Sequence, residues 1–130
     1  MSATYGFTKH VKLGFNEAIE KVTEELKKEG FGVLTEIDVT ATLKKKLDVD
    51  FKPYRILGAC NPPFAHKALQ AEEQIGLMLP CNVIVYQNTP EETIVSAVDP
   101  IASMAAVHNE SLHPIAGEVR SKLQRVIDAL

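Results

Sequence analysis

The sequence contains no apolar stretch approaching the roughly 20 residues that a helix needs to cross a membrane. Its first eight residues also lack an apolar core of signal-peptide length. We therefore expect a soluble, cytoplasmic protein without a membrane partner. Cysteine is scarce as well: the two residues, Cys60 and Cys81, are expected to stay reduced in the cytoplasm and to pack as small hydrophobic groups.

An excess of positive charge is also missing, since the formal net charge is −3. Non-specific nucleic-acid binding depends on a basic face, so we predict no nucleic-acid partner. The only basic run is Lys44–Lys46, and three lysines more often form a solvated helix face than a binding patch.

Established catalytic motifs are absent from the chain. There is no G-x-S-x-G elbow, Walker A loop, dinucleotide fingerprint or H-E-x-x-H sequence. His108 and His113 are five residues apart and do not share the face of a helical metal pair. The sequence therefore leaves open whether the protein is an enzyme.

The length of 130 residues predicts a single domain over residues 1–130. Two long amphipathic helices are indicated by apolar residues at helical spacing, over 15–28 and 115–127. Gly30 is suited to end the first helix in a left-handed conformation, and Pro114 is tolerated in the first turn of the second.

Runs of alternating or apolar residues predict five strands, at 4–11, 31–39, 53–60, 78–87 and 92–98. Thr40 is placed to cap a short helix that continues to Leu47. The order β-α-β4-α, with strands in runs, favours an α+β fold: a mainly antiparallel sheet with the two long helices on one face.

The second face of such a sheet is expected to carry apolar residues too. We assign to it Leu34, Leu57, Ile84, Val95 and Ala97. An apolar second face on a small open sheet predicts a homodimer.

The sequence around Cys60 predicts the end of a strand followed by a helix. Asn61 is suited to accept a hydrogen bond from a first-turn amide, and Pro62 to occupy the first position of a helix over 62–71. The start of the helix favours a Cys60 thiolate, whereas burial favours the thiol. The sequence does not decide between them.

Cys81 lies in the apolar run of the fourth predicted strand, with Asn82 pointing the other way. If the third and fourth strands are antiparallel, Cys60 and Cys81 come close together. A disulfide, a redox pair or two ligands of a metal site then become possible, and His66 is the histidine nearest in sequence to Cys60. Asp99 precedes Pro100, a position that suits a helix cap better than a catalytic acid.

Three segments resemble one known family: YRILGACNPPFAHKAL at 54–69, IGLMLPCNVIVYQ at 75–87 and VSAVDP at 95–100. The chain is similar, over essentially its whole length, to the bacterial and archaeal family called domain of unknown function 302. The resemblance implies a fold like that of the TATA-box-binding protein and a dimer. It implies neither DNA binding nor any activity.

Three functional hypotheses follow. The first is a dimeric protein that binds a small ligand or anion near 60–66, with candidate contacts from Cys60, Asn61, His66, Cys81, Asn82 and Asp99. The second is a redox enzyme or sensor that uses Cys60 and Cys81. The third is metal binding, with zinc as the possible cofactor and Cys60, Cys81 and His66 as ligands; otherwise we expect no cofactor.

Overall fold

The computed structural model describes residues 5–130. Five strands form one sheet, in the order β1-β5-β4-β3-β2, and every neighbouring pair is antiparallel. The strands are β1 (Gly6–Val11), β2 (Gly32–Asp38), β3 (Tyr54–Cys60), β4 (Cys81–Thr89) and β5 (Glu92–Val98). The predicted start of the first strand at residue 4 lies outside the described residues.

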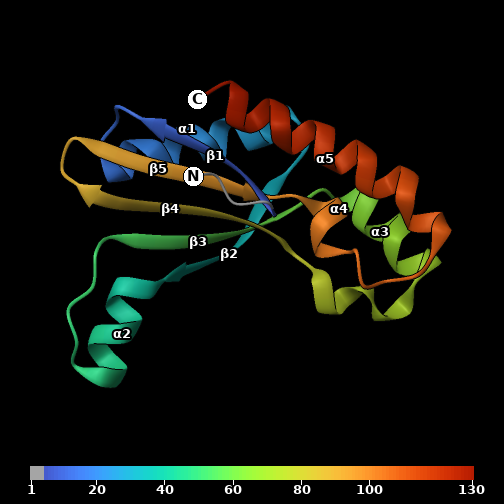
Figure 1. Ribbon diagram of the computed structural model, residues 1–130, viewed down its shortest axis with the longest axis horizontal. Coiled ribbons are helices and arrows are strands. Elements are labelled where there is room, and N and C mark those ends of the chain that lie inside the picture. The colour runs from blue at the N-terminus through green and yellow to red at the C-terminus, as the bar shows by residue number, and fades with distance from the viewer. Residues whose placement is uncertain (1–4) are drawn as a thin grey trace.

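Two long helices, α1 (Phe15–Lys28) and α5 (His113–Asp128), lie on one face of the sheet (Figure 1). Their apolar stripes and the inward residues of the strands form the main core, which includes Val22, Leu26, Val83 and Leu123. Gly30 has a φ of +87°, and its amide donates to the carbonyl of Lys27, so it ends α1 as predicted. The α+β fold with two long helices on one face is confirmed.

No helix of residues 5–130 covers the other, open face of the sheet, and three residues that were predicted to lie on that face do not. Leu57, Val95 and Ala97 are buried beneath the helices, because they share the inward register of Val83 and Val85. The prediction failed because β3 and β5 each carry consecutive buried residues and show no clear alternation from which their phase could be read. Ile84 does lie on the open face, and Leu34 is exposed at a bulge of β2.

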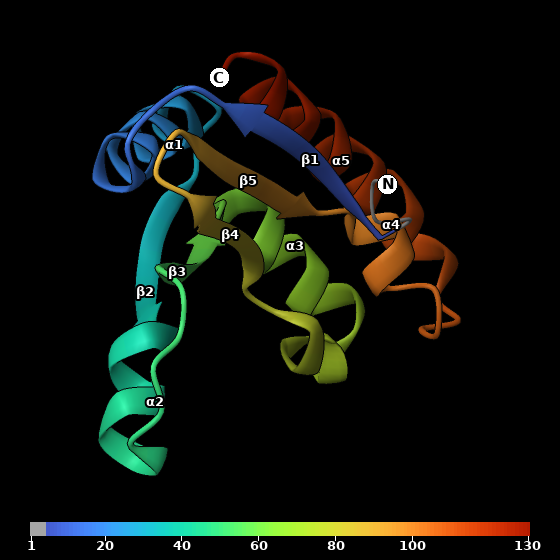
Figure 2. The ribbon, with the colours of Figure 1, turned by 60° about the vertical axis from the view of Figure 1, so that its left-hand side comes forward.

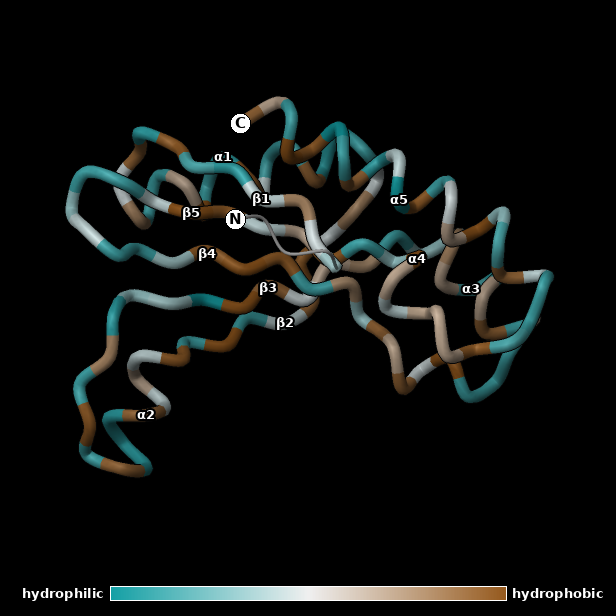
Figure 3. The backbone as a smooth tube through the Cα atoms, in the orientation of Figure 1, coloured by the Kyte–Doolittle hydropathy of each residue, from teal (hydrophilic) through white to brown (hydrophobic). Residues whose placement is uncertain are grey.

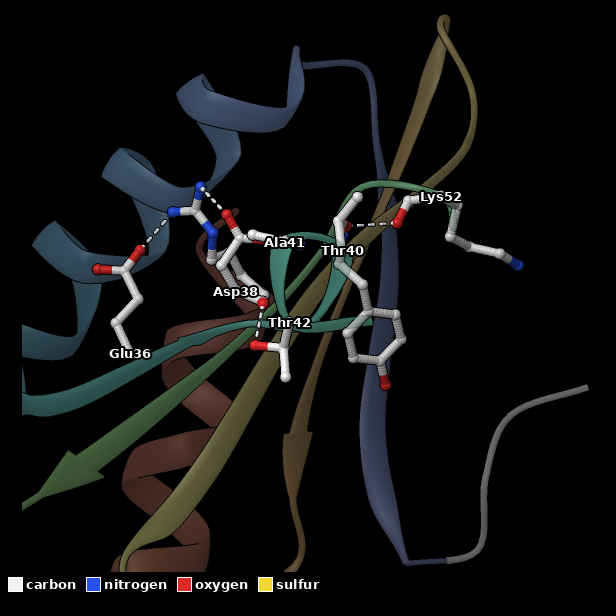
Figure 4. Close-up of polar contacts among 8 residues, drawn as sticks. Glu36, Asp38, Thr40, Ala41, Thr42 and Lys52 are labelled. Carbon is white, nitrogen blue, oxygen red and sulfur yellow. Dashed lines mark hydrogen bonds and ion pairs between the residues drawn. The ribbon is translucent and has the colours of Figure 1, made fainter. Parts of the chain in front are cut away.

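Helix α2 (Val39–Leu47) projects away from the rest of the molecule beside β2 and β3 (Figures 1 and 2). Its cap is Asp38, not Thr40: the Asp38 carboxylate accepts from the amide of Ala41 at 2.9 Å. Thr40 instead donates to the carbonyl of Lys52 and accepts from the amide of Tyr54, which fastens the first turn of α2 to the start of β3 (Figure 4).

The remaining helices gather beyond the end of the sheet where β3 ends and β4 begins (Figure 1). They are α3 (Pro62–Ala71), α4 (Pro100–Ser103) and the two short 3₁₀ helices Glu73–Met78 and Glu110–Leu112. Ala68, Ile75 and Leu112 form a second, smaller core here. Strand β4 begins at Cys81, three residues later than predicted, because Pro80 has no amide hydrogen to donate to the ladder.

Candidate functional site

A cavity of about 330 Å³ lies where the main core and the smaller core meet. Its walls come from the end of β3, the start of β4, α3, α4 and α5. Figure 3 shows a hydrophobic stretch in β4 and hydrophobic segments that alternate with hydrophilic ones along α3 and α5. The apolar wall includes Phe31, Phe64, Ala65, Ala68, Leu79, Met104, Ile115 and Val119. A cavity with such walls favours an apolar occupant over ordered water.

Cys60 and Cys81 both line this cavity, so the structure brings the two cysteines to one site as the sequence predicted. The antiparallel register explains it: Cys81 stands opposite Ala59, the residue before Cys60. Both are free thiols. Burial, and to a smaller degree the neighbouring Cys60, raise the pKa of Cys81 to about 11, so Cys81 is a protonated thiol at neutral pH.

Asn61 also lines the cavity and is buried; it occupies the predicted N-cap position of α3, but its side chain makes no cap hydrogen bond there. Its side-chain amide donates instead to the carbonyl of Glu29, at 3.1 Å. The missing side chain of Gly30 makes room for this contact, since a Cβ there would stand 3.1 Å from Asn61 Nδ2. The predicted position is right and the predicted hydrogen bond is wrong, because the side chain of Asn61 satisfies the end of α1 rather than the start of α3.

The other three candidate residues lie outside the cavity. His66 is exposed on α3, and Asn82 is exposed on the open face of the sheet. Asp99 caps α4 by accepting from the amide of Ile101, and its second oxygen pairs with Arg120 at 3.2 Å. The structure therefore assigns Asp99 a structural role.

The described part of the chain holds no group of three or more His, Cys, Asp or Glu side chains placed to bind a metal ion. Cys60 and Cys81 share the cavity, but His66 does not join them. Zinc binding by these three residues stays a prediction without geometric support, and elemental analysis of protein prepared without an affinity tag tests it.

The sequence did not reveal the walls contributed by α4 and α5. Met104, Ile115, Ala116 and Val119 line the cavity although they follow Cys81 by more than twenty residues. Their helical spacing was visible, yet nothing in it showed that this end of α5 extends past the sheet to cover α3.

None of the helices in residues 5–130 is long and apolar enough to cross a membrane.

Fold and cavity together define a small α+β protein with an apolar pocket, open to solvent on one side, beside two free cysteines. The family model for the domain of unknown function DUF302 matches residues 7–130, and the chain belongs to this family. A similar solved structure is an uncharacterised conserved DUF302 protein from Bacillus stearothermophilus, at 35% identity and a TM-score of 0.88, covering 97% of this chain and 98% of that one. No curated protein matches the chain.

Proposed function

We propose that the protein binds a small, predominantly apolar ligand in the cavity between α3, α5 and the β3–β4 end of the sheet. The observation that carries this proposal is an apolar cavity of about 330 Å³ at the junction of two hydrophobic clusters. Ligand pockets commonly measure roughly 300–1,000 Å³ and are lined mostly by hydrophobic side chains.

The volume of the cavity indicates the size of the apolar group that it can hold. A dry cavity of about 150 Å³ lined by Leu, Ile and Phe is enough to bind benzene. The cavity here, at about 330 Å³, has room for one substituted ring or a short branched chain. The polar groups of the wall come from Thr35, Asn61 and the thiols of Cys60 and Cys81.

An anionic ligand at the start of α3 is disfavoured by the sequence of the helix itself. Pro62 and Pro63 occupy its first two positions and have no amide hydrogen. The amide of Ala65 already donates to the carbonyl of Asn61. Phe64 alone remains among the first three positions with an amide hydrogen, which is too few to cradle an anion.

Toluene is a suitable probe because it is apolar and has one ring. We expect a titration followed by two-dimensional amide NMR to shift resonances of residues 59–69, 79–81 and 115–119. Ala65→Leu places additional side-chain volume in the cavity and is expected to weaken toluene binding by at least tenfold. Ala41→Leu makes the same change on the exposed surface of α2 and should leave binding unchanged.

Two results would contradict the proposal: no saturable shift near the cavity, or equal toluene binding by Ala65→Leu and the unaltered protein. Thermal unfolding of both variants shows whether they are folded. A folded Ala65→Leu protein without binding supports the cavity as the site.

Thiol chemistry is a second candidate, because Cys60 and Cys81 line one cavity. The raised pKa of Cys81 argues against Cys81 as the attacking thiolate. Cys60, which is less buried, would then be the reactive group and Cys81 the resolving one. A cytoplasmic location, predicted from the sequence, would keep both thiols reduced.

We also propose that the protein is a homodimer joined through the open face of the sheet. This face carries Ile84 and the stacked rings of Tyr54 and Tyr86, whose centroids are 5.3 Å apart. The projecting α2 arm, residues 39–53, adds exposed Leu47 and Phe51 beside it. A second copy would cover apolar surface that this chain leaves in water.

A further inference from the structure

The apolar cavity shares lining residues with a second, more polar cleft. The second cleft, of about 580 Å³, is formed by α4, the loop after it and the start of α5. Met104 and Ala116 line both spaces. Met104 directly follows α4 and is partly buried, whereas Ala116 is buried in α5.

Met104 is suited to act as an adaptable partition between the two spaces. Methionine has three rotatable bonds and a polarisable sulfur, so it fills irregular gaps and changes rotamer at little cost. Ala116, the other residue that lines both spaces, has no side chain beyond Cβ and therefore adds little volume between them. Rotation of one side chain would therefore join the apolar cavity to the cleft.

The cleft differs from the cavity in the chemistry of its rim. Three exposed polar side chains, from His108, Glu110 and His113, belong to it. A fourth polar residue, Asn109, is already committed: its side-chain amide donates to Ala71 and Glu72, and its oxygen accepts from the amide of Ser111. The imidazoles of His108 and His113 and the carboxylate of Glu110 are therefore the side-chain groups of the cleft that are available to hydrogen-bond a ligand.

Building on the proposed function, we infer that the ligand is a small amphiphile: an apolar ring or chain in the cavity and an uncharged hydrogen-bonding head, such as a hydroxyl, in the cleft beyond Met104. A neutral imidazole offers one donor and one acceptor, and a carboxylate offers acceptors. A hydroxyl matches all of these groups. A carboxylate head would be repelled by Glu110.

Four ligands with the same ring and tether test the inference: propylbenzene, 3-phenyl-1-propanol, 3-phenylpropanoate and 3-phenylpropylamine. In a closed apolar cavity, a hydroxyl without a partner costs about 1–3 kcal/mol, so the alcohol would bind roughly 5- to 150-fold more weakly than propylbenzene. If the head reaches the cleft, we expect the alcohol to bind at least as tightly as propylbenzene. It should also bind more tightly than the carboxylate or the amine.

Variants of the cleft locate the head. His108→Phe combined with His113→Phe keeps the aromatic bulk but removes the hydrogen bonds. We expect it to weaken the alcohol about 3- to 10-fold, in line with a net hydrogen-bond contribution of about 0.5–1.5 kcal/mol. Binding of propylbenzene should not change. His66→Phe is the matched control, because His66 is an exposed histidine on α3 outside both spaces.

Met104 is tested separately by exchange kinetics. Met104→Ala removes the partition and should accelerate exchange of the alcohol, measured by NMR line shapes. Met104→Leu keeps the volume and should slow that exchange relative to Met104→Ala.

The outcomes separate this inference from the proposed function. If no probe binds, toluene included, the proposed function fails. If toluene and propylbenzene bind but the alcohol binds more weakly than propylbenzene, the cavity binds ligands and the amphiphile inference is overturned. Equal losses for the alcohol and propylbenzene in the double histidine variant would also overturn it, as would tightest binding of the carboxylate or the amine.

Discussion

At the scale of single residues, the two cysteines show how similar sequence contexts lead to different chemistry. Both precede an asparagine, but Cys81 is an inward residue of a central strand and Cys60 ends an inner strand at a cavity. Burial removes water that would stabilise a thiolate, which explains why the pKa of Cys81 rises. The inward direction of Cys81 could be predicted, since its strand alternates clearly.

The role of Asn61 could not be predicted in the same way. An asparagine before a proline and a helical pattern is an ordinary cap signal. Its actual partner, the carbonyl of Glu29, is 32 residues earlier and comes near only through the β2–β3 pairing. Long-range partners of this kind depend on the fold and cannot be predicted from the neighbouring residues in the sequence.

The buried thiol gives a testable difference between the cysteines. In a Cys60→Ala variant, we expect Cys81 to resist iodoacetamide near pH 8, far below the rate of free cysteine, because it is protonated and buried. In a Cys81→Ala variant, Cys60 should react faster than Cys81 does. Equal rates for the two thiols, or free-cysteine rates at Cys81, would contradict the assignment.

The same pKa predicts a dependence of stability on pH. The unfolded thiol has the lower pKa, with the ordinary thiol value of 9.0 against about 11 for folded Cys81. Between these values the unfolded state binds fewer protons, so the free energy of unfolding should fall as pH rises. Denaturant titrations in this range should show a shallower fall for Cys81→Ala. An identical pH profile for this variant would contradict the prediction.

At the scale of elements, the close packing of the strands leaves no room for a side chain at Gly58. A Cβ on Gly58 would stand 2.1 Å from Thr35 Oγ1 and 2.8 Å from Pro80 Cγ. The packing of β2 against β3 and the approach to β4 thus both depend on the absence of a side chain at this position.

Gly58→Ala is expected to destabilise the protein by about 1–3 kcal/mol, the usual cost of overpacking. Gly32→Ala is the matched control, since the added Cβ on this other strand glycine would meet nothing within 4 Å. Chemical denaturation measures both. A stability of Gly58→Ala equal to that of Gly32→Ala would show that the contact is relaxed in solution.

Element boundaries were predictable where a residue type has a single strong preference. The boundaries of α3 and β5 follow the sequence signals, because prolines begin the helix and Pro90 lies in the turn just before the strand. The cap of α2 was placed on Thr40 rather than Asp38 because either residue can cap a helix. Thr40 is engaged by Lys52 and Tyr54, which only the chain reversal after α2 brings near.

At the scale of the whole molecule, the helices cover only one face of the sheet, and α2 extends beyond it (Figure 2). The fold class could be predicted because strands in runs with two long helices leave few arrangements. The cavity could not, because it depends on how α4 and α5 close over α3 from a distance in sequence.

The proposed dimer gives the prediction at this scale. Ile84→Glu places a charge on the open face and should convert a dimer to a monomer in sedimentation equilibrium. Leu77→Glu is the control, since Leu77 is 79% exposed on the 3₁₀ helix outside the sheet. A monomeric unaltered protein, or a dimer that survives Ile84→Glu, would contradict the proposed interface.

The central claim is that the cavity admits an apolar molecule. The most direct test is a crystal structure of the protein soaked in bromobenzene, with the bromine located by its anomalous signal. The account predicts a bromine peak inside the cavity, bounded by Phe64, Met104, Ile115 and the two cysteines. A cavity filled by rearranged side chains, with bromine absent or bound elsewhere on the molecule, would contradict it.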